Sequence, residues 1–161
     1  MSLTTDIVAS YRGPRQVVRR LMAHGPREDR ALAFLMGACL VFFIAQWPVL
    51  AREAHLTGGD LNSSLAGALA ATLLFLPLFF YALSFIAHLF ARVIGGVGTP
   101  FGSRLALFWA LIAASPLRLL VGLVAGFIGE GVQLQLVEFI WFAVFAWFWI
   151  SGMVTVHRED T

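Results

Sequence analysis

Lysine is absent from this 161-residue chain, and all eleven basic residues are arginines. Without lysine, the chain has neither Schiff-base chemistry nor the lysine that a Walker-type phosphate loop requires. The single cysteine, Cys39, excludes an internal disulfide. The four histidines include no pair at i,i+4 spacing, and no HExxH or serine-protease arrangement occurs. The sequence therefore predicts a protein that is not an enzyme and has no metal and no cofactor.

Charge is also scarce, because charged residues make up 12% of the chain and hydrophobic residues 60%. A soluble domain usually has about 25% charged residues and about 45–50% apolar ones. The apolar residues come in runs too long to be buried in one small domain, so lipid must be the solvent for much of the surface. No basic patch is interleaved with exposed aromatics, so we expect membrane lipids and not nucleic acid as partners.

Four segments are long and apolar enough to cross a bilayer, which needs about 20 residues of helix. They are residues 31–50, 64–91, 104–128 and 134–156. Pro77 interrupts the second and Pro116 the third. The sequence predicts an all-α polytopic transmembrane bundle of four to five spans. At Pro116 one kinked helix is the simplest interpretation, with a re-entrant hairpin or two short spans as alternatives.

The arginines predict the orientation of the chain. With four spans and both ends inside, nine arginines are cytoplasmic, Arg52 is outside and Arg118 lies within the membrane. The positive-inside rule favours this arrangement, with a cytoplasmic N-terminus. The chain then divides into a basic segment (1–30), a transmembrane bundle (31–156) and a short tail (157–161). Trp47, Trp109 and Trp149 are candidate interface anchors.

The basic segment contains a predicted amphipathic helix that begins at Pro14. Its apolar arc is Val17, Val18, Leu21 and Met22, and its basic arc is Arg15, Arg19 and Arg20, with Arg12 just before it. Such a helix is suited to lie on an anionic membrane surface. The alternative is a solvated basic arm.

Arg118 is the main candidate for an intramembrane site, because a central arginine costs about 2.5–3.5 kcal/mol to insert and usually faces the bundle interior. Small residues recur around it every four positions, which lets another helix approach closely. The small residues are Ala106, Ala110, Ala114, Gly122 and Gly126. Glu138 on the fourth segment is the expected partner, and Glu130 is the alternative. The pair is either a structural ion pair or part of a polar pathway or headgroup site.

The second segment carries a polar face made of Tyr81, Ser84, His88 and Arg92, spaced three and four residues apart. A polar face on a lipid-embedded helix should turn inward. His88 is either a hydrogen-bonded structural residue or a proton relay.

The pattern resembles the bacterial branch of the Yip domain family, the Ypt/Rab-interacting-protein-like membrane proteins. The resemblance rests on "PREDRALAFLMGACLVFFIAQWP", "LFLPLFFYALSFIAHLFARVIGGVGT" and "SRLALFWALIAASPLRLLVGLVAGFIG", and it covers roughly residues 10–155. It implies a polytopic helical bundle with a cytoplasmic N-terminus and no catalytic residues. The family is usually described with five spans, whereas the apolar segments here number four.

Two functions follow from these features. The first is a non-catalytic scaffold or adaptor that associates with lipid and with other membrane proteins or further copies of itself. The second is a small oligomeric channel, permease or lipid-moving protein that uses Arg118, Glu138 and His88 in a polar pathway. An intramembrane enzyme is disfavoured because no nucleophile–base pair or metal set is present.

Overall fold

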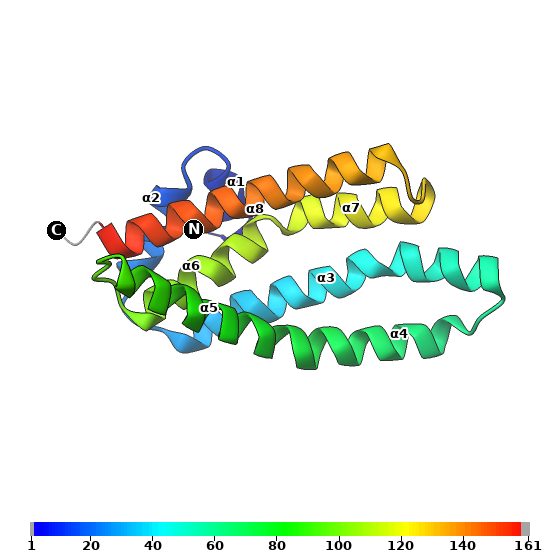
Figure 1. The fold of residues 1–161 in the computed structure, drawn as a ribbon, viewed down its shortest axis with the longest axis horizontal. Helices are drawn as coiled ribbons and strands as arrows, with labels where there is room; N and C mark the ends of the chain where they lie inside the picture. Colours follow the sequence, from blue (N-terminus) through cyan, green and yellow to red (C-terminus); the bar gives the residue numbers. More distant parts are fainter. Residues whose placement is uncertain (1, 159–161) are drawn as a thin grey trace.

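Helices alone make up the regular structure of the part of the chain that the computed structural model describes, residues 2–158. Two short helices, α1 (Leu3–Ser10) and α2 (Pro14–Met22), precede four helical columns. The columns are α3 (Glu28–Thr57), α4–η1–α5 (Leu61–Ala70, Ala71–Phe75 and Leu76–Val93), α6–α7 (Pro100–Ala113 and Ser115–Phe127) and α8 (Val132–Arg158). Consecutive columns run antiparallel, with the α3–α4 and α7–α8 connections at one end and the α5–α6 connection at the other (Figure 1).

Three of the columns are long and apolar enough to span a membrane by themselves. They are α3, the continuous helix Leu61–Val93 and α8. The fourth, α6–α7, passes the same test only as a pair, bent by 44° at its break. The predicted all-helical architecture is confirmed for residues 2–158. Three helices are long and apolar enough to cross a membrane, or four if the bent pair counts as one span.

Local sequence explains where several columns begin and end. Asp60 caps α4, because its carboxylate accepts hydrogen bonds from the Asn62 N–H (3.1 Å) and the Ser63 hydroxyl (2.7 Å). These bonds also lower the pKa of Asp60, the Ser63 bond most. Thr99 caps α6 in the same way, and Pro100 occupies the first helical position. The left-handed backbone of Gly58, with φ of 70°, ends α3.

Pro77 does not interrupt its column. The proline lacks an N–H, so the preceding turn loses a hydrogen bond. The chain responds with the wide π turn Ala71–Phe75 just before the proline, and the helix then continues to Val93.

Pro116 has a larger effect, because the helix breaks at Ala114 between α6 and α7. The Leu117 N–H bonds to the Ala114 carbonyl (3.1 Å), one residue later than in a regular helix. The carbonyls of Ile112 and Ala113 therefore lose their helical partners. The Ser115 hydroxyl donates to the Ile112 carbonyl (2.6 Å).

The second freed carbonyl, that of Ala113, binds the N-terminal hairpin, which consists of α1, α2 and the turn between them. The Tyr11 hydroxyl donates to the Ala113 carbonyl at 2.8 Å. Burial raises the pKa of Tyr11, so the hydroxyl keeps the proton that it donates. The break in the third column is thus closed by a residue about one hundred positions earlier in the chain.

Replacing Tyr11 with phenylalanine should lower the free energy of unfolding by about 1–2 kcal/mol, because a partly buried carbonyl is left unpaired. Tyr81→Phe is the matched control, since the Tyr81 hydroxyl makes no hydrogen bond within residues 2–158. Denaturant unfolding in micelles measures both variants. Equal losses in the two would mean that the Tyr11 hydrogen bond does not stabilise the break.

Helix α6 lies at the centre of the bundle, where α1, α2, α3, α5 and α8 all pack against it. Almost every residue from Phe101 to Ser115 is buried. Trp109 is 1% exposed, donates from its indole nitrogen to the Ser10 hydroxyl (2.9 Å) and packs edge-on against Phe34. The prediction that Trp109 anchors the membrane interface is therefore wrong, because protein encloses this helix on all sides.

The predicted amphipathic helix is α2, but its apolar face does not point outward. Val17, Val18 and Leu21 are at most 4% exposed and belong to the core, where α2 packs on α8 and α6. The apolar side chains of α6 and α8 cover this face of α2, so it is buried in protein. The expectation that the apolar arc faces lipid is corrected accordingly.

Helix α8 extends beyond the boundary predicted for the bundle. It continues to Arg158, and His157 is buried within the packed end. The expected tail 157–161 therefore begins two residues too early, because His157 finds partners inside the protein. Residues 159–161 lie outside the described part of the chain.

Candidate functional site: a polar cavity around Arg118

Arg118 lies in the first turn of α7, directly after the break at Ala114. Its side chain is half-buried and lines a cavity between α3, α7 and α8. The guanidinium carbon lies 5.2 Å from the centre of the Trp141 ring and 5.7 Å from that of Phe42. Aromatic faces at this range attract a cation, so the two rings stabilise the charge on the inner side of the cavity.

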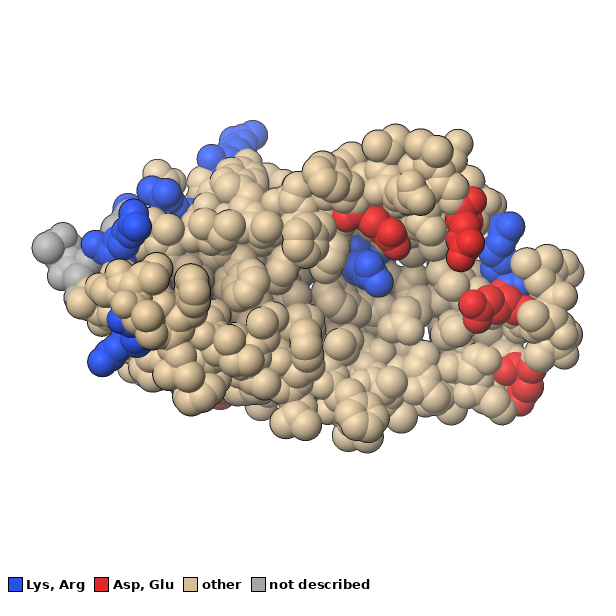
Figure 2. Space-filling model, in the orientation of Figure 1, with Lys and Arg blue, Asp and Glu red and all other residues tan. Residues whose placement is uncertain are grey.

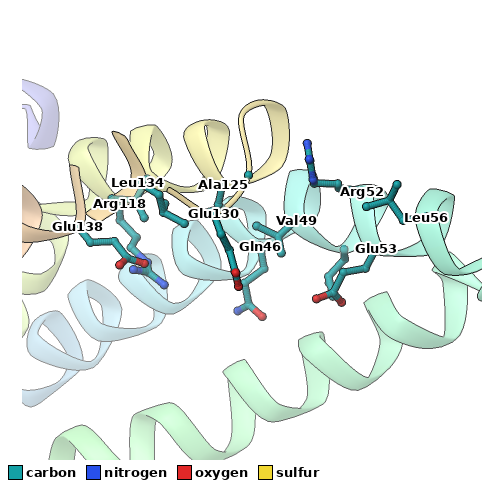
Figure 3. A pocket seen from close by; sticks show the side chains of 15 residues that line it. Gln46, Val49, Arg52, Glu53, Leu56, Arg118, Ala125, Glu130, Leu134 and Glu138 are labelled. Atoms are coloured by element: carbon teal, nitrogen blue, oxygen red, sulfur yellow. The ribbon is translucent and has the colours of Figure 1, made fainter. Parts of the chain in front are cut away.

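Glu138 on α8 lines the same cavity and interacts electrostatically with Arg118. Figure 3 shows the two side chains pointing toward each other. Among the described residues, no oxygen of Glu138 lies within the 4.0 Å of an Arg118 nitrogen that would make an ion pair. The expected partner is therefore near but not in contact, and space remains between the charges.

The cavity has a volume of about 490 Å³. Beyond Arg118 and Glu138, its walls are mainly apolar side chains and small residues of α3, α7 and α8. Three further charged residues, Arg52, Glu53 and Glu130, line it toward the end where α3 and α7 finish. Arg52 donates to the Gly126 carbonyl at 3.3 Å, which ties these two helix ends together. Glu130, the alternative partner of Arg118, lines the cavity but forms no ion pair with Arg118.

The wall between α3 and α7 depends on two glycines. A Cβ atom placed on Gly122 would lie 2.0 Å from the Ala45 carbonyl oxygen, and one on Gly126 would lie 2.2 Å from the Pro48 side chain. Real Cβ atoms are not found closer than 3.0 Å to such neighbours. The glycines therefore allow the two backbones to meet.

The three alanines of the predicted small-residue row lie in the α6 part of the column. Ala106, Ala110 and Ala114 are at most 1% exposed. Ala106 faces Gly152 of α8, where an added Cβ would approach to 3.0 Å. The row therefore serves two different contacts, α6 with α8 and α7 with α3, because the 44° bend separates its halves.

The polar face predicted on the second segment turns inward only in part. Ser84 and His88 are buried, Tyr81 is half-buried against Phe108, and Arg92 is exposed. The Ser84 hydroxyl donates to the Tyr81 carbonyl (2.8 Å) within its own helix. None of these residues lines the Arg118 cavity.

His88 belongs instead to a second polar cluster with Ser103 and His157. His88 Nδ1 lies 3.1 Å and His157 Nε2 lies 2.8 Å from the Ser103 hydroxyl oxygen. The Gly98 N–H donates to His157 Nδ1 (3.1 Å), which leaves Nε2 to carry the proton of the neutral ring. The cluster fastens the α5–α6 loop to the end of α8.

Sequence reasoning missed this cluster because His157 lies 69 positions after His88, beyond the predicted last span. The one usable signal was the glycine-rich loop, since Gly96 and Gly98 leave room for the His157 ring. No group of three or more histidine, cysteine or carboxylate side chains that could hold a metal ion is found within residues 2–158.

The basic residues of the N-terminal segment lie on and beside α2. Arg12, Arg15 and Arg19 are exposed, and Arg20 pairs with Asp6 of α1 at 3.3 Å. They do not reach the Arg118 cavity.

The chain was compared with family models, with curated proteins and with solved structures, and no match was found in any of the three.

Proposed function

We propose that this protein is a non-catalytic integral membrane protein of the Yip type, in which the Arg118 cavity holds the headgroup of a membrane lipid. It acts as a scaffold or adaptor that associates with lipid and with other membrane proteins or copies of itself. One observation carries the proposal: Arg118 is half-buried beside Glu138 with no ion pair between them and with a cavity of about 490 Å³ adjoining both.

The chemistry of the cavity favours a zwitterionic headgroup. An arginine within a bilayer is costly unless a partner satisfies its donors. A lipid phosphate accepts charge-assisted hydrogen bonds from a guanidinium, and a lipid ammonium can pair with a carboxylate. Arg118 and Glu138 supply one charge of each sign on facing helices. A phosphoethanolamine headgroup carries one complementary charge for each of them.

The orientation that we propose places the N-terminus in the cytoplasm of a bacterium, with the chain in the inner membrane. In Figure 2 the basic side chains gather at the end where Figure 1 shows the α5–α6 connection, while acidic side chains dominate the opposite end. The acidic end carries Glu53, Asp60 and Glu130, from the end of α3 and the two connections there. The positive-inside rule favours this orientation.

The alternative of a channel or permease has less support. Its pathway requires His88 to join Arg118 and Glu138, but His88 lies in the separate cluster with Ser103 and His157. Between the two sites stands the enclosed part of α6, where Leu107, Phe108 and Leu111 are at most 1% exposed.

Lipid retention tests the proposal. We expect native mass spectrometry of the detergent-purified protein to show a retained phosphatidylethanolamine. Arg118→Leu should reduce its retention at least about tenfold, because hydrogen bonds to a charged group contribute about 1.5–3 kcal/mol. Arg92→Leu is the matched control, since Arg92 is an exposed arginine on α5 away from the cavity.

Glu138→Gln tests whether the cavity recognises the lipid headgroup or whether Arg118 and Glu138 only stabilise the fold. This variant should still bind lipid phosphate through Arg118 but should lose its preference for phosphatidylethanolamine over phosphatidylglycerol. Unchanged retention in Arg118→Leu, or an unchanged preference in Glu138→Gln, would contradict the proposed headgroup site.

A further inference from the structure

A second cavity lies between the N-terminal hairpin and α8, and it shares no lining residue with the Arg118 cavity. Its volume is about 530 Å³. One wall consists of the end of α1, the turn at Arg12 and Gly13, and the first turn of α2. The opposite wall is Trp147 and Ser151 of α8. We call this cavity the hairpin cleft.

Positive charge lines one side of the hairpin cleft. Arg12 and Arg15 both line it and are both exposed. Neither makes an ion pair or a side-chain hydrogen bond within residues 2–158. The two guanidinium groups therefore have all their donors available for an external anion.

The backbone adds donors at the same place. Helix α2 begins here with Gly13 as its N-cap, and no side chain caps it. Pro14 has no N–H, and the N–H groups of Arg15 and Gln16 have no acceptor among the described residues. Uncapped N–H groups and the helix dipole favour a negative charge beside the two arginines.

Each wall of the cleft also has a large apolar side chain that is exposed. Trp147 is 45% exposed and Val8 is 62% exposed. Tryptophan is enriched at the membrane interface because its ring sits at the level of the headgroups. A cationic pocket next to exposed apolar side chains fits a molecule with an anionic head and a hydrocarbon tail, and not a free anion alone.

We propose that the hairpin cleft is a binding site for an anionic phospholipid, whose phosphate pairs with Arg12 and Arg15 and whose acyl chains lie along Val8 and Trp147. The apolar face of α2 stays buried on the bundle, so the helix need not insert into the bilayer. The bound lipid instead joins the α1–α2 hairpin to α8 and fixes the hairpin at the membrane surface. The site is separate from the Arg118 cavity and does not depend on the function proposed for it.

Binding of dioctanoyl-phosphatidylglycerol to the full chain in a neutral detergent, with dioctanoyl-phosphatidylcholine for comparison, tests this site. We expect tighter binding of the anionic lipid. The double variant Arg12→Gln/Arg15→Gln should weaken it roughly 30-fold, because each arginine near a lipid surface contributes about 1 kcal/mol, or about fivefold. Arg27→Gln/Arg92→Gln removes the same charge from exposed positions outside the cleft. This control should change binding less than about threefold, because salt screens distant charges.

Glycerol phosphate distinguishes a lipid site from a site for a free anion. It has a phosphate but no acyl chain, so it should not compete with the lipid at equal concentration. Equal competition would overturn the assignment to a lipid, and equal losses in the two double variants would overturn the assignment to the cleft. Arg118→Leu should bind the anionic lipid as tightly as the unchanged protein does. The experiment therefore tests the hairpin cleft independently of the Arg118 cavity.

Discussion

Gly122→Ala should destabilise the bundle by about 3 kcal/mol or more, although it adds one methyl group. The new Cβ would lie 2.0 Å from the Ala45 carbonyl oxygen, so α3 and α7 must move apart. Backbone atoms cannot yield as a flexible side chain can, and overpacking usually costs about 1–3 kcal/mol even where side chains adjust. The loss should appear as a lower midpoint in denaturant unfolding in micelles.

Gly67→Ala is the matched control, because Gly67 lies inside α4 with no atom within 4 Å of an added Cβ. Alanine is a better helix former than glycine by roughly 0.5–1 kcal/mol, so this variant should be slightly more stable than the unchanged protein. Similar stabilities for the two variants would mean that α3 and α7 are not in backbone contact at Gly122.

Trp109→Ala should cost about 3–5 kcal/mol, which is the usual loss when a large buried aromatic is truncated. The indole is 1% exposed, packs on Phe34 of α3 and donates to Ser10 of α1. Its removal leaves a cavity at the point where the N-terminal hairpin meets the bundle. We also expect faster proteolysis within residues 3–22, because the hairpin loses part of its attachment.

Trp147→Ala removes the same side chain from a position that is 45% exposed on α8. It should lower the free energy of unfolding clearly less than Trp109→Ala does, since nearly half of the Trp147 side chain is already exposed and its loss leaves no enclosed cavity. If Trp109→Ala were no more harmful than Trp147→Ala, α6 would not be the enclosed centre of the bundle.

The number and places of the apolar columns were predictable from the sequence, because run length and hydropathy identify helices that lipid can surround. The small and charged residues within these runs were also informative. Gly122 and Gly126, four positions apart, indicated a close helix contact, and the structure gives their partners on α3 as Ala45 and Pro48. Glu138 was predicted as the partner of Arg118, and it lines the same cavity, although the two side chains form no ion pair.

Which apolar surface faces lipid and which faces protein was not predictable. Helix α6 and helix α5 have similarly apolar sequences, yet α6 is enclosed and α5 exposes Phe85, Ile86 and Phe90. In lipid both surroundings favour the same side chains, so composition cannot separate them. The same reason explains why Trp109 was assigned to the interface and why the apolar face of α2 was expected to contact lipid.

Contacts between polar residues far apart in the chain were also not predictable from the sequence. Tyr11 reaches the carbonyl freed by Pro116, and His157 reaches Ser103. Each of these pairs joins residues more than fifty positions apart. No local spacing encodes such pairs, because they depend on how the columns are arranged in three dimensions.

The central claim is that Arg118 holds a lipid headgroup in a cavity between α3, α7 and α8. A density map of the protein in nanodiscs that contain phosphatidylethanolamine tests it most directly. We predict a phosphate within hydrogen-bonding distance of the Arg118 guanidinium, about 3 Å, with the ammonium beside Glu138. A cavity without lipid, in which Arg118 and Glu138 close onto each other as a direct ion pair, would contradict the account.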